Sequence, residues 1–286
     1  MNWSGVIPAI TTPFREDLSV DHDFLAKHAK WMIDSGCSGI VALGSLGEGA
    51  TLEFDEKLAV LQTLVRTLRI PIVATISALS TSGAVLLAKK AEDGGCSGLM
   101  VLPPYVYSTD WREMKAHVSA VLRATKLSCM LYNNPIAYRT DFLPEQIAEL
   151  AEEHSNLQAV KESAADIRRL TSIRSLLGNR LAIFVGVDDL IVEGMAAGAV
   201  GWIAGLVNAL PQESVALFKG ADIYRWFLPL LRLDTVPKFV QLIKLVQSEV
   251  GMGSERVRPP RLELAGDERE SALRVIRTAL ASRPRV

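Results

Sequence analysis

Residues 36–44 read GCSGIVALG, and residues 95–102 read GCSGLMVL. In both places a glycine follows a segment with helical spacing, and an apolar run without polar alternation comes next. A glycine just past a helix suits a left-handed cap. An apolar run that is covered on both faces is typical of a parallel strand. The two stretches therefore predict one repeated unit, in which a helix turns into a buried strand.

The same alternation extends over most of the chain. We expect eight strands, at residues 6–9, 39–44, 71–76, 98–102, 128–132, 157–161, 181–186 and 199–204. Helical spacing follows each of them, at residues 21–35, 53–68, 81–93, 110–125, 144–153, 167–177, 190–197 and 212–218. Eight strand–helix units in this length predict the α/β class and a (β/α)₈ barrel, or TIM barrel, rather than an open sheet.

The pattern beyond the eighth unit is helical. Helices are expected at residues 224–250, where Pro229 and Pro237 should kink or divide the segment, and at residues 267–282. We therefore expect a catalytic barrel domain over residues 1–210. Residues 211–286 would hold the last barrel helix and a C-terminal helical extension.

Composition excludes several classes of protein. The 286 residues are 49% hydrophobic and 22% charged, which excludes intrinsic disorder. The 31 basic and 32 acidic residues give a net charge of −1 without a basic cluster, so we expect no nucleic-acid partner. Three cysteines, with no close pair and no histidine at metal-ligand spacing, indicate free thiols and a cytoplasmic protein. The uncharged stretch at residues 194–212 contains several glycines, which predicts a buried strand between turns and no membrane span.

In a barrel of this kind the reactive groups lie at the C-terminal ends of the strands. Lys161 ends the apolar run at residues 157–160, whereas lysines such as Lys27 and Lys57 fall in helical runs. A lysine that emerges from the barrel core loses solvation of its ammonium form. Its pKa falls, and the free amine can attack a carbonyl or imine carbon. The alternative is a lysine whose ammonium group reaches solvent and pairs with Glu162 or another surface acid.

The loop at residues 44–48, GSLGE, follows the second strand and precedes a helix that Thr51 should cap. Its two glycines let backbone N–H groups turn outward, which would suit a carboxylate. The alternative is an ordinary turn between strand and helix.

Two more loops carry candidate groups. Tyr132 closes the fifth strand and could relay a proton to a leaving group if the Ser45 hydroxyl connects it to solvent. The alternative is a packing residue with a satisfied hydroxyl. Small residues at 186–189 (GVDD) and 201–205 (GWIAG) leave room for a ligand whose hydroxyls Asp188 could hold. Tight packing of the barrel mouth is the alternative there.

Residues 5–14 (GVIPAITTPF), 44–48 (GSLGE), 132–135 (YNNP) and 160–163 (VKES), in this order, resemble the dihydrodipicolinate synthase and N-acetylneuraminate lyase superfamily of Schiff-base class I lyases. The resemblance extends from residue 5 to about residue 245. It implies a barrel that assembles as a homodimer or homotetramer. It also implies that no metal or organic cofactor is needed, because the lysine imine is itself the electron sink.

The resemblance assigns roles to individual residues. Lys161 would form the imine, Tyr132 would shuttle protons, and Ser45 with nearby N–H groups would bind the carboxylate of a 2-oxo acid. The other expected substrate-binding residues are Thr11, Gly44, Leu46, Gly47, Tyr105, Tyr107, Asn134, Tyr138, Gly186, Asp188 and Ile203.

Departures from the family pattern bear on the substrate. Leu46 replaces a second hydroxyl in the loop at residues 44–48, which we call the carboxylate loop. Tyr105 and Tyr107 break the usual tyrosine pair that a neighbouring subunit contributes to the site, so either tyrosine could serve in the proton relay. Ala137 and Tyr138 occupy the stretch where dihydrodipicolinate-forming members carry an arginine for a second carboxylate. We therefore do not expect a role in lysine biosynthesis.

Finer resemblance comes from residues 132–138 (YNNPIAY), 201–209 (GWIAGLVNA) and 224–231 (YRWFLPLL). These resemble the branch that removes water and ammonia from 1-pyrroline-4-hydroxy-2-carboxylate in hydroxyproline degradation, giving 2-oxoglutarate semialdehyde. The alternative is a 2-keto-3-deoxy-pentonate (arabonate) dehydratase or another aldolase or synthase of the family. A non-enzymatic 2-oxo acid binding protein would be expected to lack the lysine or the tyrosine, and both are present.

Overall fold

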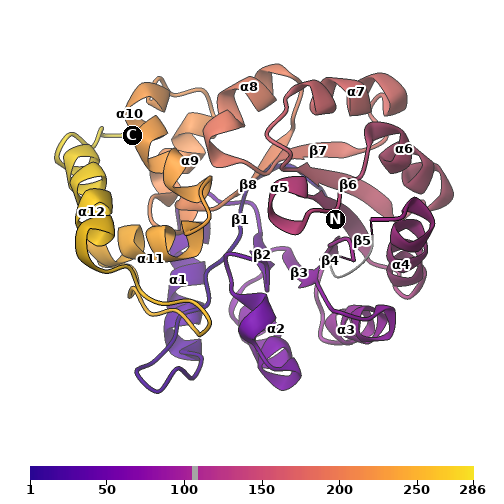
Figure 1. Cartoon of the computed structure of the whole chain (residues 1–286), viewed down its shortest axis with the longest axis horizontal. Coiled ribbons are helices and arrows are strands. Elements are labelled where there is room, and N and C mark those ends of the chain that lie inside the picture. The colour runs from indigo at the N-terminus through magenta and orange to yellow at the C-terminus, as the bar shows by residue number, and fades with distance from the viewer. Residues whose placement is uncertain (105–108) are drawn as a thin grey trace.

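A closed ring of short parallel strands forms the centre of the computed structural model, which describes residues 1–104 and 109–286 (Figure 1). Their order is β1-β8-β7-β6-β5-β4-β3-β2, and a parallel bridge between Ala9 and Val41 joins the two ends. This confirms the (β/α)₈ barrel expected from the sequence. The strands are β1 (Gly5–Pro8), β2 (Ile40–Ala42), β3 (Ile72–Ile76), β4 (Gly98–Val101), β5 (Ser128–Asn133), β6 (Leu157–Glu162), β7 (Ala182–Val185) and β8 (Gly201–Ala204).

Helices surround the ring and return the chain to the start of each next strand (Figure 1). The helices of the barrel units are α1 (His22–Asp34), α2 (Phe54–Thr67), α3 (Thr81–Asp93), α4 (Trp111–Arg123), α6 (Pro144–Glu153), α7 (Arg168–Leu177), α8 (Ile191–Ala196) and α9 (Pro211–Phe218). A short helix, α5 (Pro135–Tyr138), follows β5 directly. Four 3₁₀ turns complete these connections, namely η1 (Gly49–Thr51), η2 (Asp188–Leu190), η3 (Leu206–Asn208) and η4 (Arg232–Asp234).

The repeated turn from helix to strand has the same geometry in both places. Gly36 has φ +102° and Gly95 has φ +87°, the left-handed region that favours glycine. After them, the Ser38 N–H donates to Val6 O on β1, and the Ser97 N–H donates to Ile72 O on β3. Each turn therefore forms a hydrogen bond to the preceding strand of the barrel just before the next strand begins.

One expectation about a helix end is wrong. Thr51 does not cap α2, because η1 intervenes and Glu53 occupies the cap position, where its side chain and that of Glu56 form a capping box. The expected division of residues 224–250 is confirmed, although Pro229 itself lies inside α10 (Tyr224–Leu231). The break falls between residues 232 and 238, and α11 (Phe239–Glu249) begins beyond Pro237.

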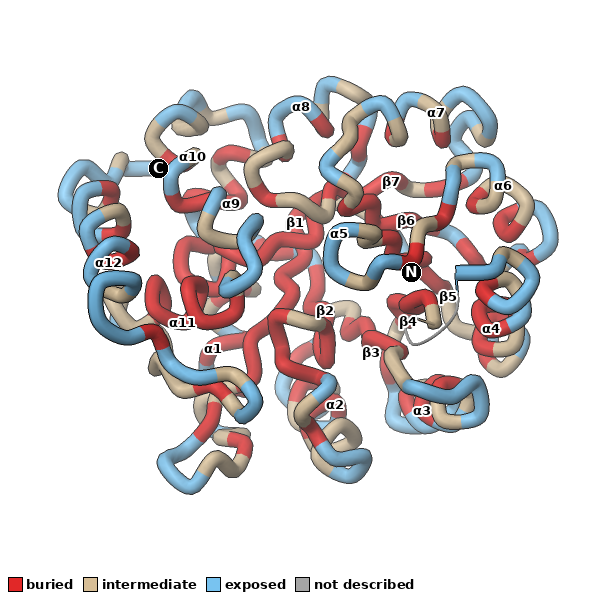
Figure 2. Tube along the Cα trace, viewed as in Figure 1, coloured by how far each residue is buried: buried red, intermediate tan, exposed pale blue. Residues whose placement is uncertain are grey.

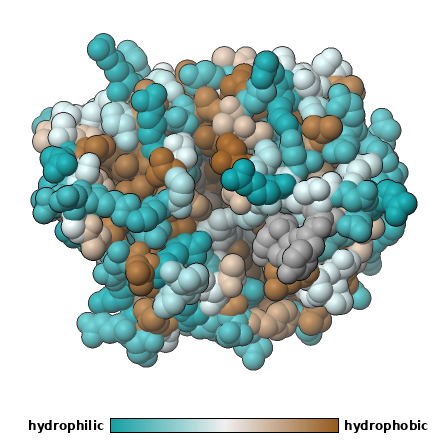
Figure 3. All heavy atoms as spheres, in the orientation of Figure 1, coloured by the Kyte–Doolittle hydropathy of each residue, from teal (hydrophilic) through white to brown (hydrophobic). Residues whose placement is uncertain are grey.

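The C-terminal helices pack onto the barrel next to its first unit. Nearly all of α11 is buried, whereas α12 (Gly266–Ala281) is exposed along its outer side (Figure 2). The uncharged stretch at residues 194–212 contains the buried strand β8 followed by η3. Among the described residues, no helix has the length and apolar character needed to cross a membrane. Hydrophilic side chains cover most of the periphery of the face in Figure 3, with apolar patches between them.

Candidate active site

Lys161 lies near the end of β6, between Tyr132 of β5 and Phe184 of β7 in the strand register. Its side chain is buried, and its Nζ lies 4.0 Å from the centroid of the Tyr132 ring. Gly186 provides the space, because a Cβ at that position would lie 2.7 Å from Lys161 Cε. Strand alternation directs Lys161 into the barrel and the next residue, Glu162, to the other side of the sheet.

Burial lowers the pKa of Lys161 to about 8, although the nearby carboxyl groups of Asp234 and Asp188 oppose this shift. At neutral pH roughly a tenth of the Lys161 amines are then uncharged, against less than about a thousandth for a solvated lysine. The amine is therefore available as a nucleophile.

Tyr132 places its hydroxyl beside the amide of Asn134, whose Nδ2 donates to it at 2.9 Å. Burial raises the pKa of Tyr132 to about 12, and hydrogen bonding with Asn134, Ser163 and Ser45 opposes the shift in part. The phenol thus stays protonated at neutral pH. It can give a proton to a leaving group near Lys161 and recover it through its hydroxyl neighbours.

The loop at residues 44–48 ends in a strained but anchored turn. Glu48 adopts a left-handed conformation with φ +52°, and its buried carboxylate accepts a hydrogen bond of 2.6 Å from Lys244 Nζ on α11. Within the loop, the Ser45 hydroxyl is hydrogen-bonded to the Tyr138 hydroxyl on α5. The Tyr138 ring meets the Tyr132 ring edge to face, with centroids 5.8 Å apart. Ser45 therefore lies between two phenols.

Of the remaining candidate residues, several have their polar groups engaged by the protein. Thr11 donates from Oγ1 to Gln247 and from its backbone N–H to Asn208, and Gly47 O accepts from Thr12 Oγ1. Asp188 accepts hydrogen bonds from Trp202 Nε1 and from the N–H groups of Gly205 and Leu206.

The other candidates differ in position. Leu46 and Ile203 are buried, and Gly44 faces the hydroxyl of Thr75, which lies 3.6 Å from where a Cβ would stand. Tyr105 and Tyr107 lie outside the described residues.

The lysine, the tyrosine and the loop hydroxyl thus converge at the C-terminal end of the barrel. Among residues 1–104 and 109–286, no cluster of histidine, cysteine, aspartate or glutamate has the makeup of a metal site.

The sequence profile of the Dihydrodipicolinate synthetase family matches residues 2–279. The chain belongs to this family. A 4-hydroxy-tetrahydrodipicolinate synthase from Geotalea uraniireducens (strain Rf4) is 31% identical over 92% of this chain and 94% of its own. Another, from Agrobacterium fabrum, is 30% identical over 95% of this chain and 96% of its own.

Solved structures agree with this assignment. A putative dihydrodipicolinate synthetase from Pseudomonas aeruginosa superposes with a TM-score of 0.91 at 29% identity, covering 98% of this chain and all 100% of the other. A dihydrodipicolinate synthase from Acinetobacter baumannii, solved with pyruvate, superposes with a TM-score of 0.89 at 29% identity and covers 96% and 98% of the two chains. The protein is thus a lyase of the dihydrodipicolinate synthetase family, whose members use a lysine imine.

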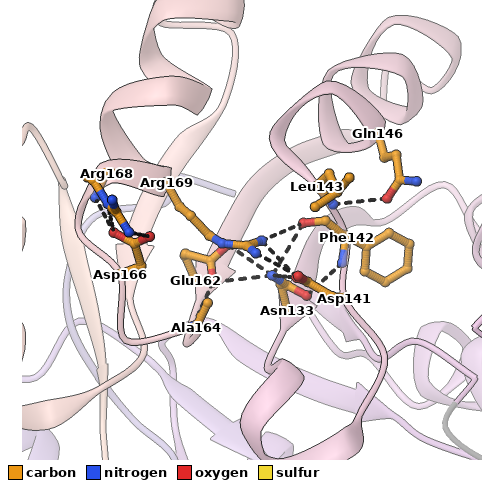
Figure 4. A network of polar contacts seen from close by, with 10 residues as sticks. All are labelled: Asn133, Asp141, Phe142, Leu143, Gln146, Glu162, Ala164, Asp166, Arg168 and Arg169. Atoms are coloured by element: carbon orange, nitrogen blue, oxygen red, sulfur yellow. Dashed lines mark hydrogen bonds and ion pairs between the residues drawn. The ribbon is translucent and has the colours of Figure 1, made fainter.

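A polar network behind the active site of this family member was not anticipated from the sequence. Figure 4 shows Glu162 facing Asn133, whose Nδ2 donates to both carboxylate oxygens at 3.1 and 3.3 Å. Asn133 also bonds to Asp141, which forms a two-point ion pair with Arg169. Burial raises the pKa of Glu162 to about 7. The network fixes the ends of β5 and β6, the strands that carry Tyr132 and Lys161.

Asp234 is a second group that sequence reasoning missed. It lies on η4, 73 positions after Lys161, and it acts electrostatically on that lysine. No local motif marks it, because only the packing of the C-terminal helices brings η4 to the barrel mouth.

Proposed function

We propose that this protein is a lysine-imine lyase that dehydrates and deaminates 1-pyrroline-4-hydroxy-2-carboxylate to 2-oxoglutarate semialdehyde. The single observation that carries the imine chemistry is the buried Lys161, whose Nζ lies 4.0 Å from the centre of the Tyr132 ring. A buried amine with a depressed pKa next to a protonated phenol suits addition to a C=N or C=O carbon.

The chemistry balances on this substrate. The Lys161 amine adds to C2 of the ring, and the C2–N1 bond breaks as a proton moves to N1, which leaves a lysine imine and a primary amine at C5. The imine acidifies C3, so the C3 proton leaves and the C4 hydroxyl departs as water with a proton from Tyr132. Shift of the double bond toward C5 then yields a second imine. Hydrolysis of both imines consumes two waters and releases ammonia, the semialdehyde and free Lys161.

The charges at the barrel mouth support a substrate without a second carboxylate. Two acids, the buried Asp188 and the partly buried Asp234, lie close enough to Lys161 to act on it electrostatically. Tyr138 occupies a position from which its hydroxyl bonds Ser45, and the following Arg139 is exposed. A second carboxylate would meet these two carboxyl groups there rather than a further cation, in contrast to the substrate class expected of a dihydrodipicolinate-forming enzyme.

A 2-keto-3-deoxy-pentonate dehydratase is the second candidate. It would use the same imine and the same elimination, and it would reach the same product. The unsatisfied side chain of Thr75 at the carboxylate loop and the acids near β8 suit its carboxylate and hydroxyls equally well. The homodimer or homotetramer stays a prediction, which light scattering of the purified protein would check.

The test is a comparison of kcat/KM for 1-pyrroline-4-hydroxy-2-carboxylate, 2-keto-3-deoxy-arabonate, and pyruvate plus an aldehyde that carries a carboxylate. The proposal expects the first value to exceed the others at least tenfold. In parallel, borohydride reduction should trap substrate on the wild-type enzyme but not on Lys161→Ala, as read by intact mass. Highest activity with the carboxylate-bearing aldehyde would assign the protein the activity for which its curated relatives are named.

A further inference from the structure

A carboxyl oxygen without a hydrogen-bond partner among the described residues belongs to a side chain that acts electrostatically on Lys161. Among the described residues, Asp234 Oδ1 is buried without a hydrogen-bond partner. Gly205, just after β8, makes room for it, because a Cβ there would lie 2.1 Å from Oδ1 and 2.6 Å from Oδ2. Any larger residue at 205 would expel this carboxyl group.

Asp234 belongs to the mouth of the barrel. It interacts electrostatically with Lys161 and Asp188, and it also acts on the Tyr132 phenol. These three residues lie on or just beyond β6, β7 and β5, so Asp234 on η4 is a fourth group that acts on this part of the site.

The two acids near Lys161 differ in whether their oxygens already accept hydrogen bonds from the protein. Asp188 has its oxygens occupied by one indole and two backbone N–H groups. Asp189, the next residue, faces Arg232 at 3.7 Å. Asp234 has no such partner for Oδ1, and an unsatisfied buried carboxyl oxygen costs stability unless a ligand supplies a donor.

A second unsatisfied polar atom lies at the opposite end of the site. Thr75 Oγ1 on β3 is buried without a partner among residues 1–104 and 109–286, and it faces Gly44 of the carboxylate loop. A substrate whose carboxylate binds at this loop and whose C2 reaches Lys161 on β6 has its remaining atoms directed toward β7 and β8. Asp234 lies on that side of the site and could bind a donor group of the substrate.

We propose that Asp234 protonates and binds the primary amine that ring opening releases at C5 of the substrate. This inference rests on the proposed function. The carboxyl proton moves to the amine lone pair, which converts an acid and a neutral amine into a carboxylate–ammonium ion pair. The transfer prevents the amine from closing the ring again by attack on C2. Burial and the neighbouring Asp188 raise the pKa of Asp234 well above its usual range, which favours the protonated carboxyl group in the free enzyme.

The test measures imine formation separately from turnover. Wild type, Asp234→Asn and Asp234→Ser are incubated with pyruvate or with 1-pyrroline-2-carboxylate, a ring without the hydroxyl, and the adduct on Lys161 is trapped with borohydride and weighed. Asp189→Asn is the matched control, because Asp189 acts electrostatically on Asp234 but is not among the groups that shift the pKa of Lys161. We expect both Asp234 variants to trap the pyrroline at least tenfold more slowly and pyruvate at an unchanged or higher rate.

The results of this experiment distinguish the role of Asp234 from the proposed overall reaction. Equal losses with both ligands would mean that Asp234 only supports the structure, and no loss relative to Asp189→Asn would mean that it does not bind the amine. Either result overturns the inference. If the wild type traps the pyrroline through Asp234 but does not turn over the hydroxylated ring, the proposed reaction fails while the inference holds.

Discussion

Replacing Lys244 by methionine should destabilise the fold and weaken substrate binding together. The Lys244 side chain is 3% exposed and that of Glu48 is 0% exposed, and they form an ion pair of 2.6 Å between α11 and the carboxylate loop. Lys244 Nζ also donates to Arg256 O and lies 4.4 Å from the centre of the Phe14 ring. The substitution removes all of these contacts and leaves the Glu48 charge in the interior.

Breaking one side of a buried ion pair costs about 3–5 kcal/mol, because the remaining charge is left without compensation. Glu48 would keep a hydrogen bond of 3.0 Å from the Arg258 N–H and an ion pair of 3.9 Å with Arg261. We therefore expect the lower end, about 3 kcal/mol. For a chain of this length that corresponds to a melting temperature lowered by roughly 5 °C.

The assay is denaturant unfolding of the full chain together with the KM for the 2-oxo acid or imino acid substrate. Lys238→Met is the matched control, since the Lys238–Glu268 pair is about half exposed and should contribute less than about 1 kcal/mol. Adding Glu48→Gln to Lys244→Met should restore part of the stability, because the unpaired charge is removed. A Lys244→Met protein no less stable than the Lys238→Met control would refute the reasoning.

Three further predictions concern the site, two from substitutions and one from the pH dependence of imine formation. Gly186→Ala should abolish borohydride trapping on Lys161, because the new Cβ would lie 2.7 Å from Lys161 Cε and 2.0 Å from Ser163 Oγ; normal trapping would contradict the packing described. The rate of imine formation should rise with pH up to about 8 and then level off, as a stopped-flow profile would show, since only the uncharged amine reacts. Glu162 has a folded-state pKa raised to about 7 by burial, so its contribution to stability is full below about 4.5 and is lost as pH rises through 7, on the order of 3 kcal/mol. Glu162→Gln should flatten the stability profile over that window, and an unchanged slope would exclude this assignment.

The sequence predicted the barrel because each unit carries its own local information. Apolar runs without alternation mark strands covered on both faces, and a glycine such as Gly36 or Gly95 marks the turn that feeds each strand. Lys161 stood out for the same reason, as a lysine ending such a run. These features depend on residues close together in the chain, and a periodic pattern records them directly.

The turn before α2 was less predictable than the helix itself. The helix expected over residues 53–68 begins at Phe54, but the sequence did not predict η1 or the left-handed conformation of Glu48. Glu48 is held there by Lys244, which lies 196 positions later in the chain. A contact at that separation leaves no trace in local spacing and overrides the propensity of the loop.

The sequence by itself determined the strand–helix repeat, the family pattern and the residues expected to react, because periodicity and short motifs are local properties. Tertiary structure alone decided which groups surround Lys161. Asp234 reaches it from η4, and the Glu162–Asn133 network lies behind it. The depressed pKa of the amine has the same origin, since desolvation and long-range charge depend on what the closed barrel and its C-terminal helices bring within a few ångströms of one atom.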